Sequence, residues 1–299
     1  MHHEPDTSPL RVLVTGATGM LGSTLVPTLQ ARGATVLTLA RGGDVSQRVD
    51  LRDRARTFDA VAETHPDCIV HLAAATNVDV CEKDPQLAYE LNVLASQNVA
   101  DACCAMGTPP ALVHISTDHV YDGEGLNQEA GICIRNHYAM SKLAGEYAAQ
   151  LAPQTTVLRV NFAGQSRCAG RPSFSDWLVQ ALRSRTVIQV FEDVWFSPLR
   201  VATLSEAIWQ VVQHPVRGVF NLGCKGQTSK AGYARRLASG LQLDSAHLHT
   251  ASLRARTDLS RRPLGMGMDS TRFEQVFDYT LPTVEQEATA LCMEYLNDL

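Results

Sequence analysis

Short apolar runs alternate with segments of helical periodicity along the first half of the chain. The apolar runs are predicted strands, which lie at Leu10–Thr15, Ala34–Ala40, Cys68–Ala73, Ala111–Ser116 and Thr155–Val160. The intervening segments are predicted helices, which lie at Ser23–Arg32, Arg54–Thr64, Pro85–Met106 and Tyr138–Leu151. Continuously apolar strands that alternate with helices are typical of a parallel sheet covered on both faces. The pattern therefore predicts an α/β fold with a doubly wound, Rossmann-type sheet.

The regular alternation loosens beyond Asn161. Helices are predicted at Phe174–Ser184, Thr203–Gln213, Lys230–Gly240 and Thr283–Tyr295, with short strands at Val187–Val190 and Val219–Leu222. We expect a dinucleotide-binding domain over residues 10–165. Residues 166–299 should form mainly a smaller α+β lobe for substrate, interleaved with the first domain, over the carboxyl ends of the strands.

Composition narrows the class of protein. Of the 299 residues 45% are hydrophobic and 19% charged, which predicts a substantial core, and the net charge of -5 argues against nucleic-acid or anionic-membrane partners. No stretch approaches the ~20 apolar residues of a membrane span. The polar start, Met1 to Pro9, lacks the order of a secretory signal, so we expect a cytoplasmic protein. The eight scattered cysteines predict reduced thiols and no metal site.

A glycine-rich loop follows the first predicted strand. Glycines at such positions permit a tight turn, let the backbone approach a pyrophosphate and let helix and strand pack closely. The amino terminus of the next helix would offer free N–H groups to the phosphates. The alternative is an ordinary structural turn, which the strand–loop–helix context disfavours. The candidate cofactor-binding residues here are Gly16, Thr18, Gly19, Met20, Leu21 and Gly22.

The end of the second predicted strand bears on the choice of cofactor. It reads Thr38-Leu39-Ala40-Arg41, without the carboxylate that usually binds the ribose of NAD. The guanidinium of Arg41 suits a 2′-phosphate, so NADPH is favoured, NADH is the alternative, and Arg41 could instead be a solvated surface charge. Asp50 and Leu51 are candidates to border the adenine. Helix capping by Asp50 or Asp53 explains these carboxylates equally well.

Tyr138 and Lys142 are candidate catalytic residues because they stand four residues apart on one predicted helical face. A nearby ammonium stabilises a phenolate and lowers the pKa of the phenol toward a working range. Ser116 and Thr117 end a predicted strand, which places hydroxyl groups at the same edge of the sheet. One of them could hydrogen-bond a substrate carbonyl while Tyr138 donates its proton. Each pair alone could be a chance surface arrangement, but together with the glycine loop they indicate a dehydrogenase site.

In these motifs the chain resembles the extended short-chain dehydrogenase/reductase superfamily, and within it the family of dTDP-4-dehydrorhamnose reductases. The resembling stretches run nearly end to end: Gly16–Gly22, His71–Ala74, Asp79–Asn92, Ser116–Gly123, Asn136–Glu146, Phe220–Gly223 and Arg262-Pro263. The resemblance implies hydride delivery from NADPH to a 4-keto-6-deoxy sugar attached to a nucleoside diphosphate.

The resemblance also implies a role for each matching residue. Tyr138 would be the general acid, Lys142 its pKa tuner and a ribose ligand, and Thr117 the hydroxyl that orients the carbonyl. Ser116 and Asp118 would support that site. Further residues in the implied catalytic and cofactor-binding sets are Asn92, which would hold the water network of the lysine, and Ala73, Ala74, Ala75 and Asn161, which would line the cofactor.

The sequence departs from the family pattern at the sugar pocket. His119 replaces a tyrosine, which is either a packing change or an extra acid–base group. The segment after Arg159 contains Phe162 where a tryptophan-bearing motif is usual, so the sugar specificity is open. Arg262 is the preferred pyrophosphate ligand from a basic patch that could also be solvated, and Trp195 could line the pocket or anchor the lobe. The candidate substrate-binding residues are Thr117, Asp118, His119, Phe162, Trp195 and Arg262.

Two other functions fit the same motifs. One is a nucleotide-sugar epimerase or dehydratase that uses NAD(P) without net oxidation. The lone Asp118, followed by His119 instead of a second acid, weakens the dehydratase option. The other is a non-catalytic regulatory subunit similar to the beta subunit of methionine adenosyltransferase. The sequence allows a homodimer without specifying one.

Overall fold

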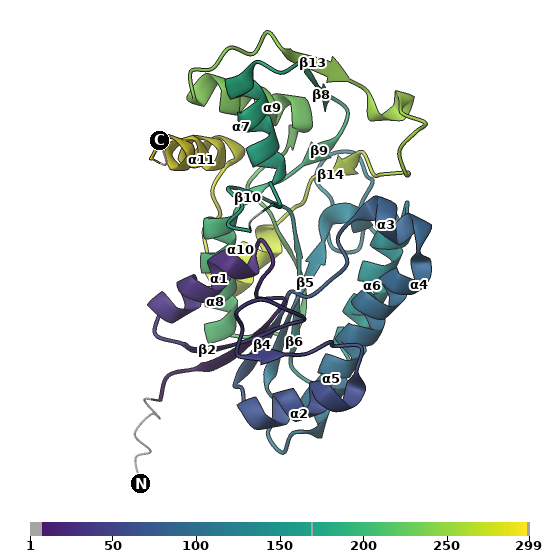
Figure 1. Cartoon of the computed structure of the whole chain (residues 1–299), viewed down its shortest axis with the longest axis vertical. Helices are drawn as coiled ribbons and strands as arrows, with labels where there is room; N and C mark the ends of the chain where they lie inside the picture. The colour runs from purple at the N-terminus through teal and green to yellow at the C-terminus, as the bar shows by residue number, and fades with distance from the viewer. Residues whose placement is uncertain (1–7, 169, 298–299) are drawn as a thin grey trace.

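A parallel sheet forms the centre of the computed structural model, which describes residues 8–168 and 170–297 (Figure 1). Within these residues the sheet has seven strands, in the spatial order β11 (Gly218–Leu222), β6 (Thr155–Val160), β5 (Ala111–Thr117), β4 (Cys68–His71), β1 (Arg11–Thr15), β2 (Thr35–Ala40) and β3 (Gln47–Arg48). All neighbouring strands run parallel. The strand order reverses between β1 and β4, which is where ligands bind in doubly wound sheets. The predicted fold class is confirmed.

Helices cover both faces of this sheet, as Figure 1 shows. On one face lie α1 (Gly22–Ala31), α8 (Val201–Gln213) and α10 (Thr271–Phe277), and on the other lie α2 (Arg54–Thr64), α5 (Ala95–Ala105) and α6 (His137–Ala149). The alternation of side chains along β1 explains the two cores. Val12 and Val14 are buried with Leu25 of α1, whereas Leu13 is buried on the opposite face with Val99 of α5.

One predicted helix is interrupted. Residues Pro85–Met106 form α4 (Pro85–Tyr89), a π-helical turn η1 (Glu90–Leu94) and then α5, and a short helix α3 (Val78–Lys83) precedes them. The π turn contains Asn92 and lies against α6, where a Cβ atom on Gly145 would clash with the Asn92 carbonyl oxygen. Such turns often occur at functional sites, and this one brings a buried amide toward the catalytic helix.

The later part of the chain forms a second core of its own, which appears at the top of Figure 1. It contains the helices α7 (Phe174–Ser184), α9 (Lys230–Gly240) and α11 (Val284–Asn297). Its short strands are β7 (Phe162–Ala163), β8 (Ile188–Phe191), β9 (Trp195–Phe196), β10 (Leu199–Arg200), β12 (Thr228–Ser229), β13 (Leu248–Ala251) and β14 (Gly265–Met266), and its 3-10 turn is η3 (Leu253–Ala255). Because α8, α10 and β11 return to the main sheet, the boundary at residue 165 stays a prediction.

Two expectations from the sequence concern the first residues of the chain and membrane-spanning segments. Most of the polar segment Met1–Pro9 lies outside the described residues. Among the residues that are described, no helix combines the length and the apolar character that crossing a bilayer requires.

Candidate active site

A cavity of about 890 Å³ lies at the carboxyl ends of the central strands. Its walls come from the segments that follow β1, β2, β4, β5 and β6, together with α6. The predicted residues that line it are Gly16, Thr18, Gly19, Met20, Leu21, Gly22, Arg41, Asp50, Leu51, Ala73, Ala74, Ser116, Thr117, Asp118, His119, Tyr138, Lys142, Asn161 and Phe162. Most of the predicted cofactor-binding and catalytic residues, although distant in the sequence, thus line the same cavity.

The glycine loop has the geometry of a phosphate-binding turn. Gly16 has a φ of +68°, and a Cβ atom there would lie 2.7 Å from the backbone nitrogen of Ala73. A Cβ atom on Gly22 would lie 2.5 Å from the Ala17 carbonyl oxygen, so the start of helix α1 can pack against the loop that follows β1 only because this residue is glycine. No side chain of the described residues caps the amino end of α1. The N–H groups of Ser23 and Thr24 donate to the carbonyl oxygens of Gly19 and Leu21, so an anion at this helix end would bind the N–H groups of the residues just before them.

Charged groups surround the far end of this cavity, beyond β2. Asp50 accepts hydrogen bonds from the Arg52 guanidinium, including one of 2.7 Å, and these bonds lower the pKa of its carboxyl. Asp53 caps α2 by accepting from the backbone N–H of Arg56, so of the two carboxylates Asp53 has the capping role. Arg171 lines the cavity together with Arg41 and was not identified from the sequence, because it lies in an irregular loop far along the chain.

Polar contacts at the cavity wall join Tyr138 to Thr117 and Thr117 to Asp118. Burial raises the pKa of the Tyr138 phenol above its usual value, and a hydrogen bond with Thr117 opposes this rise. The Thr117 hydroxyl lies 3.4 Å from Asp118 Oδ1, and it accepts a bond of 3.2 Å from the backbone N–H of His119. The long contact to Asp118 is weak, so a substrate oxygen could compete for the Thr117 proton.

Lys142 lies on the same face of α6 as Tyr138. Its ammonium donates to the Ile115 carbonyl oxygen over 2.7 Å, and burial lowers its pKa to about 8. Because this pKa stays above 7, the side chain is mostly protonated at neutral pH. The implied lowering of the Tyr138 pKa by Lys142 stays a prediction, since the groups that act on the phenol in this structure are Thr117, Asp118 and Cys81.

Asn92 and Ala75 stand behind the cavity wall rather than on it. The Asn92 amide accepts from the Ala75 N–H over 2.7 Å, and donates to the Ala75 carbonyl oxygen and to the Ser141 hydroxyl. These bonds fix the segment after β4 to helix α6, which carries Tyr138. Asn92 therefore sets the spacing between two walls of the cavity.

Asp118 is a buried carboxylate, with 1% of its surface exposed. Asn161 donates to its Oδ2 atom over 2.5 Å, and burial raises the pKa of Asp118 to about 6. The ring of His119 meets the Tyr138 ring edge-on, with 5.3 Å between centroids. Burial lowers the pKa of His119 to about 3, so the imidazole is neutral near pH 7 and its role as an extra acid is disfavoured.

Three predicted residues make contacts of a different kind. The Ser116 hydroxyl donates to Glu146 over 2.5 Å, within a buried network, and so supports the site instead of pointing its proton at substrate. The Arg262 guanidinium forms an ion pair of 2.6 Å with Asp79 and does not line the cavity. Trp195 also lies outside the cavity lining, with 43% of its surface exposed. Whether Arg262 and Trp195 contact a sugar nucleotide stays a prediction.

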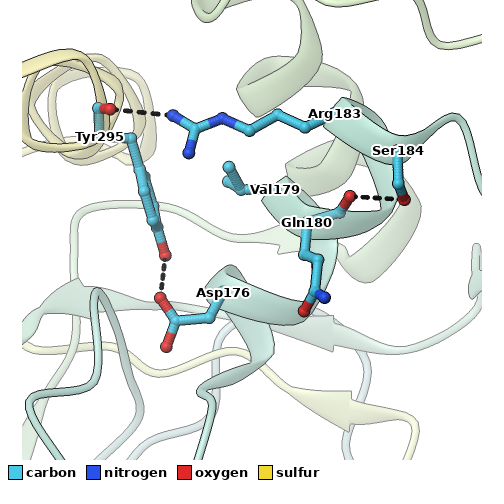
Figure 2. A pocket seen from close by; sticks show the side chains of 6 residues that line it. All are labelled: Asp176, Val179, Gln180, Arg183, Ser184 and Tyr295. Atoms are coloured by element: carbon cyan, nitrogen blue, oxygen red, sulfur yellow. Dashed lines mark hydrogen bonds between the residues drawn. The ribbon is translucent and has the colours of Figure 1, made fainter. Parts of the chain in front are cut away.

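A second hollow, of about 530 Å³, lies between α7 and α11. Figure 2 shows that its polar groups bind one another: Tyr295 donates its hydroxyl to Asp176, and Arg183 donates to the Tyr295 carbonyl oxygen. These bonds are 2.8 and 3.0 Å long and join the two helices. We interpret this hollow as a feature of helix packing. The described residues contain no group of three or more His, Cys, Asp or Glu side chains that could hold a metal ion.

The doubly wound sheet, the glycine loop and the Thr117–Tyr138–Lys142 arrangement define an extended short-chain dehydrogenase/reductase. The chain belongs to the RmlD substrate binding domain family, which matches residues 10–297. The resemblance noted from the sequence is confirmed.

Similar proteins agree with this family. The chain is 33% identical to a dTDP-4-dehydrorhamnose reductase of Streptomyces griseus, over 74% of this chain and 71% of that protein. It is 27% identical to a probable low-salt glycan biosynthesis reductase of Haloferax volcanii, over 93% of this chain and 96% of that protein. Among solved structures, dTDP-4-dehydrorhamnose reductase from Bacillus anthracis in complex with NADP has a TM-score of 0.86 and 25% identity, covering 96% of this chain and 99% of that one.

Proposed function

We propose that this protein uses NADPH to reduce the 4-keto group of a nucleoside-diphosphate 4-keto-6-deoxy sugar. One observation carries the proposal: the glycine loop and the Thr117–Tyr138–Lys142 arrangement line the same cavity. The similar reductases named above, and the NADP in the Bacillus anthracis structure, support the same activity.

The residues of the cavity fit a dinucleotide. Gly19 faces the cavity, and a Cβ atom there would meet only the Gly16 carbonyl oxygen, at 3.2 Å, so a pyrophosphate could approach this backbone. The uncapped start of α1 would bind the phosphates, Arg41 a 2′-phosphate, and Lys142 the ribose. NADH is the alternative cofactor. When bound, the cofactor would supply the hydride.

Protein side chains would supply the proton and the orientation. Tyr138 would donate its phenolic proton to the oxygen of the keto group, and Thr117 would hydrogen-bond that oxygen and hold it beside the phenol. Protonated Lys142 would stabilise the phenolate left behind. Tyr138 and Thr117 have exposed fractions of 7% and 5%, so little water would compete for the proton.

A panel of nucleotide 4-keto sugars tests the proposal, with the loss of NADPH absorbance followed for the purified protein. We expect one NADPH to be consumed for each sugar reduced. Sugar conversion without net NADPH oxidation would instead indicate an epimerase or a dehydratase. Binding of NADPH without conversion of any sugar would indicate a regulatory subunit.

The proposal also covers the position of the substrate pocket, the oligomeric state and the cellular location. We place the nucleotide-sugar pocket between the dinucleotide-binding domain, residues 10–165, and the lobe of residues 166–299. We expect a homodimer, which sedimentation of the purified protein tests. We also expect a cytoplasmic location, which cell fractionation tests.

A further inference from the structure

His71 is a buried histidine to which the proposed reaction assigns no role. It is the last residue of β4, with an exposed fraction of 1%, and the cavity-lining residue Ala73 follows two positions later. Its two ring nitrogens contact two different parts of the molecule. Nδ1 lies 2.7 Å from the hydroxyl oxygen of Thr15, the last residue of β1, and Nε2 lies 3.1 Å from the hydroxyl oxygen of Ser96 in α5. His71 therefore links the strand that leads into the glycine loop with the helix that follows the π turn.

The Thr15 end of this link reaches the wall of the cavity. Thr15 immediately precedes Gly16, and its hydroxyl oxygen accepts a long hydrogen bond of 3.4 Å from the backbone N–H of Ala73. The backbones of Gly16 and Ala73 lie so close together that a Cβ atom on Gly16 would clash with the Ala73 nitrogen. Both residues line the cavity, so Thr15 joins two adjoining parts of the wall that would contact the cofactor.

The Ser96 end of the link reaches the catalytic helix. The Ser96 hydroxyl donates to the Asn92 carbonyl oxygen in the π turn over 2.7 Å. The Asn92 amide donates to the Ser141 hydroxyl over 2.8 Å, and that hydroxyl donates to the Tyr138 carbonyl oxygen over 2.9 Å. A continuous series of hydrogen-bonded residues thus runs from the end of β1, through His71, to the first turn of α6.

The directions of these bonds fix the tautomer of the His71 ring. Ser96 has one hydroxyl proton, which it donates to Asn92, so its oxygen can only accept from Nε2–H of His71. Burial and the charge of Lys142 lower the pKa of His71 to about 3, so the ring is neutral near pH 7 and Nδ1 carries no proton. Nδ1 therefore accepts the hydroxyl proton of Thr15. In the other tautomer, Nε2 and the Asn92 carbonyl oxygen would both require the single Ser96 proton.

We propose that His71 is a positioning residue whose ring, with its proton on Nε2, sets the distance between the glycine loop and the helix that carries Tyr138. The ring is rigid and bonded at both nitrogens, and a buried polar group that loses its partner is costly, so the link stays intact. In the proposed reaction this distance decides how closely the hydride donor and the phenol approach one keto group. The kinetic consequence therefore rests on the proposed function, whereas the tautomer does not.

The tautomer is tested by nitrogen-15 NMR of the whole protein with labelled histidine rings, in which the His71→Asn variant assigns the His71 signals. Near pH 7 we expect a protonated Nε2 and an unprotonated Nδ1. Thr15→Val, which removes the hydroxyl donor, should shift the Nδ1 signal of His71. A proton on Nδ1, or on both nitrogens, would overturn the inference.

His114 is the matched control for His71. It is also 1% exposed, and its ring centre lies 5.3 Å from that of His71. Among the residues that the structure describes, neither of its ring nitrogens has a hydrogen-bond partner. Its NMR signals should therefore stay nearly unchanged in Thr15→Val.

Kinetics test the positioning role. In His71→Gln the longer amide can still donate to Ser96 but the contact with Thr15 is lost, so the KM for NADPH should rise at least about tenfold while kcat changes less. In His71→Asn the shorter amide can still accept from Thr15 but the contact with Ser96 is lost, so kcat should fall at least about tenfold while the KM for NADPH changes less. The same substitutions at His114 break no hydrogen bond to a described residue, so both constants should stay within about twofold of the wild type.

Equal losses in the two His71 variants, or equal losses at His71 and His114, would overturn the positioning role. If the His71 variants do not fold, Thr15→Val and Ser96→Ala break the same two contacts singly, and the same division between KM and kcat is expected. If the wild type reduces no nucleotide sugar, the proposed function fails, while the NMR measurement and the dissociation constants for NADPH still decide the role of His71.

Discussion

At the scale of the residue, the proposed reaction requires a buried phenol, that of Tyr138, to donate a proton. Thr117 bonds to Tyr138, Asp118 bonds to Thr117, and Asn92 fixes the helix on which Tyr138 lies. The sequence identified most of these residues because motif spacing shows which side chains share a helical face or a strand end. It missed Arg171, whose position depends on the path of an irregular loop far along the chain. Contacts between segments that are far apart in the sequence produce no hydrophobic periodicity, so a sequence pattern does not reveal them.

Removal of the phenolic hydroxyl tests the proton donor. Tyr138→Phe should lower kcat at least ~100-fold while NADPH binding changes only slightly, because the ring and its packing are retained. Tyr147→Phe on the same helix is the control, since Tyr147 is 64% exposed and away from the cavity. A Tyr138→Phe enzyme with wild-type turnover would remove Tyr138 from the mechanism.

Arg41 is tested by comparing two cofactors. If its guanidinium binds the 2′-phosphate, Arg41→Ala should raise the KM for NADPH at least about tenfold and leave the KM for NADH nearly unchanged. Steady-state kinetics with both cofactors measure this. Equal increases for the two would show that Arg41 does not discriminate between them.

At the scale of the element, a buried ion pair joins the strands and the catalytic helix. Arg159 of β6 binds Glu146 of α6 over 2.8 Å, Ser116 of β5 donates to the same carboxylate, and Arg159 also donates to the Tyr121 hydroxyl. The sequence predicted the long helices and strands closely, several of them to the residue, because their apolar periodicity is strong. It did not predict two-residue strands such as β9 and β14, which are too short to carry a period and form only through pairing with distant segments.

Breaking this pair should cost stability. Glu146→Ala leaves the Arg159 charge buried without its carboxylate, so we expect the free energy of unfolding to fall by about 3–5 kcal/mol. Urea denaturation of both proteins measures this. Glu206→Ala, which breaks the exposed pair with Arg32, is the control and should change stability by less than about 1 kcal/mol. A similar small loss for both variants would contradict the structural role of the buried pair.

At the scale of the whole molecule, three imidazoles should make stability depend on pH. His71 and His114 are each 1% exposed, and burial lowers the pKa of His71 to about 3, that of His119 to about 3 and that of His114 well below its usual value. Their folded pKa values lie below the unfolded value of about 6.5, so the unfolded chain binds more protons as the pH falls. Asp118 acts in the opposite sense below pH 6, because its folded pKa is raised.

The free energy of unfolding should therefore decrease below about pH 6.5, by about 1.4 kcal/mol per pH unit for each imidazole, with Asp118 offsetting up to one of them. Urea midpoints between pH 7.5 and pH 5.0 measure the slope. His114→Gln should make it shallower, and a change at the exposed His249 should leave it unaltered. A stability that stays constant or rises toward pH 5 would show that these imidazoles are protonated in the folded protein.

The proposed reaction requires the glycine-loop cavity to bring a hydride donor to the carbon of one keto group and the phenol of Tyr138 to its oxygen. Transfer of deuterium to a nucleotide 4-keto-6-deoxy sugar from NADPH that carries deuterium at both hydrogen positions of its reactive carbon, followed by mass spectrometry, measures this most directly. We expect the wild type to give a product sugar with one deuterium at C4, and Tyr138→Phe to give almost none. A product formed without deuterium, or the binding of labelled NADPH with no product from any keto sugar, would contradict the account.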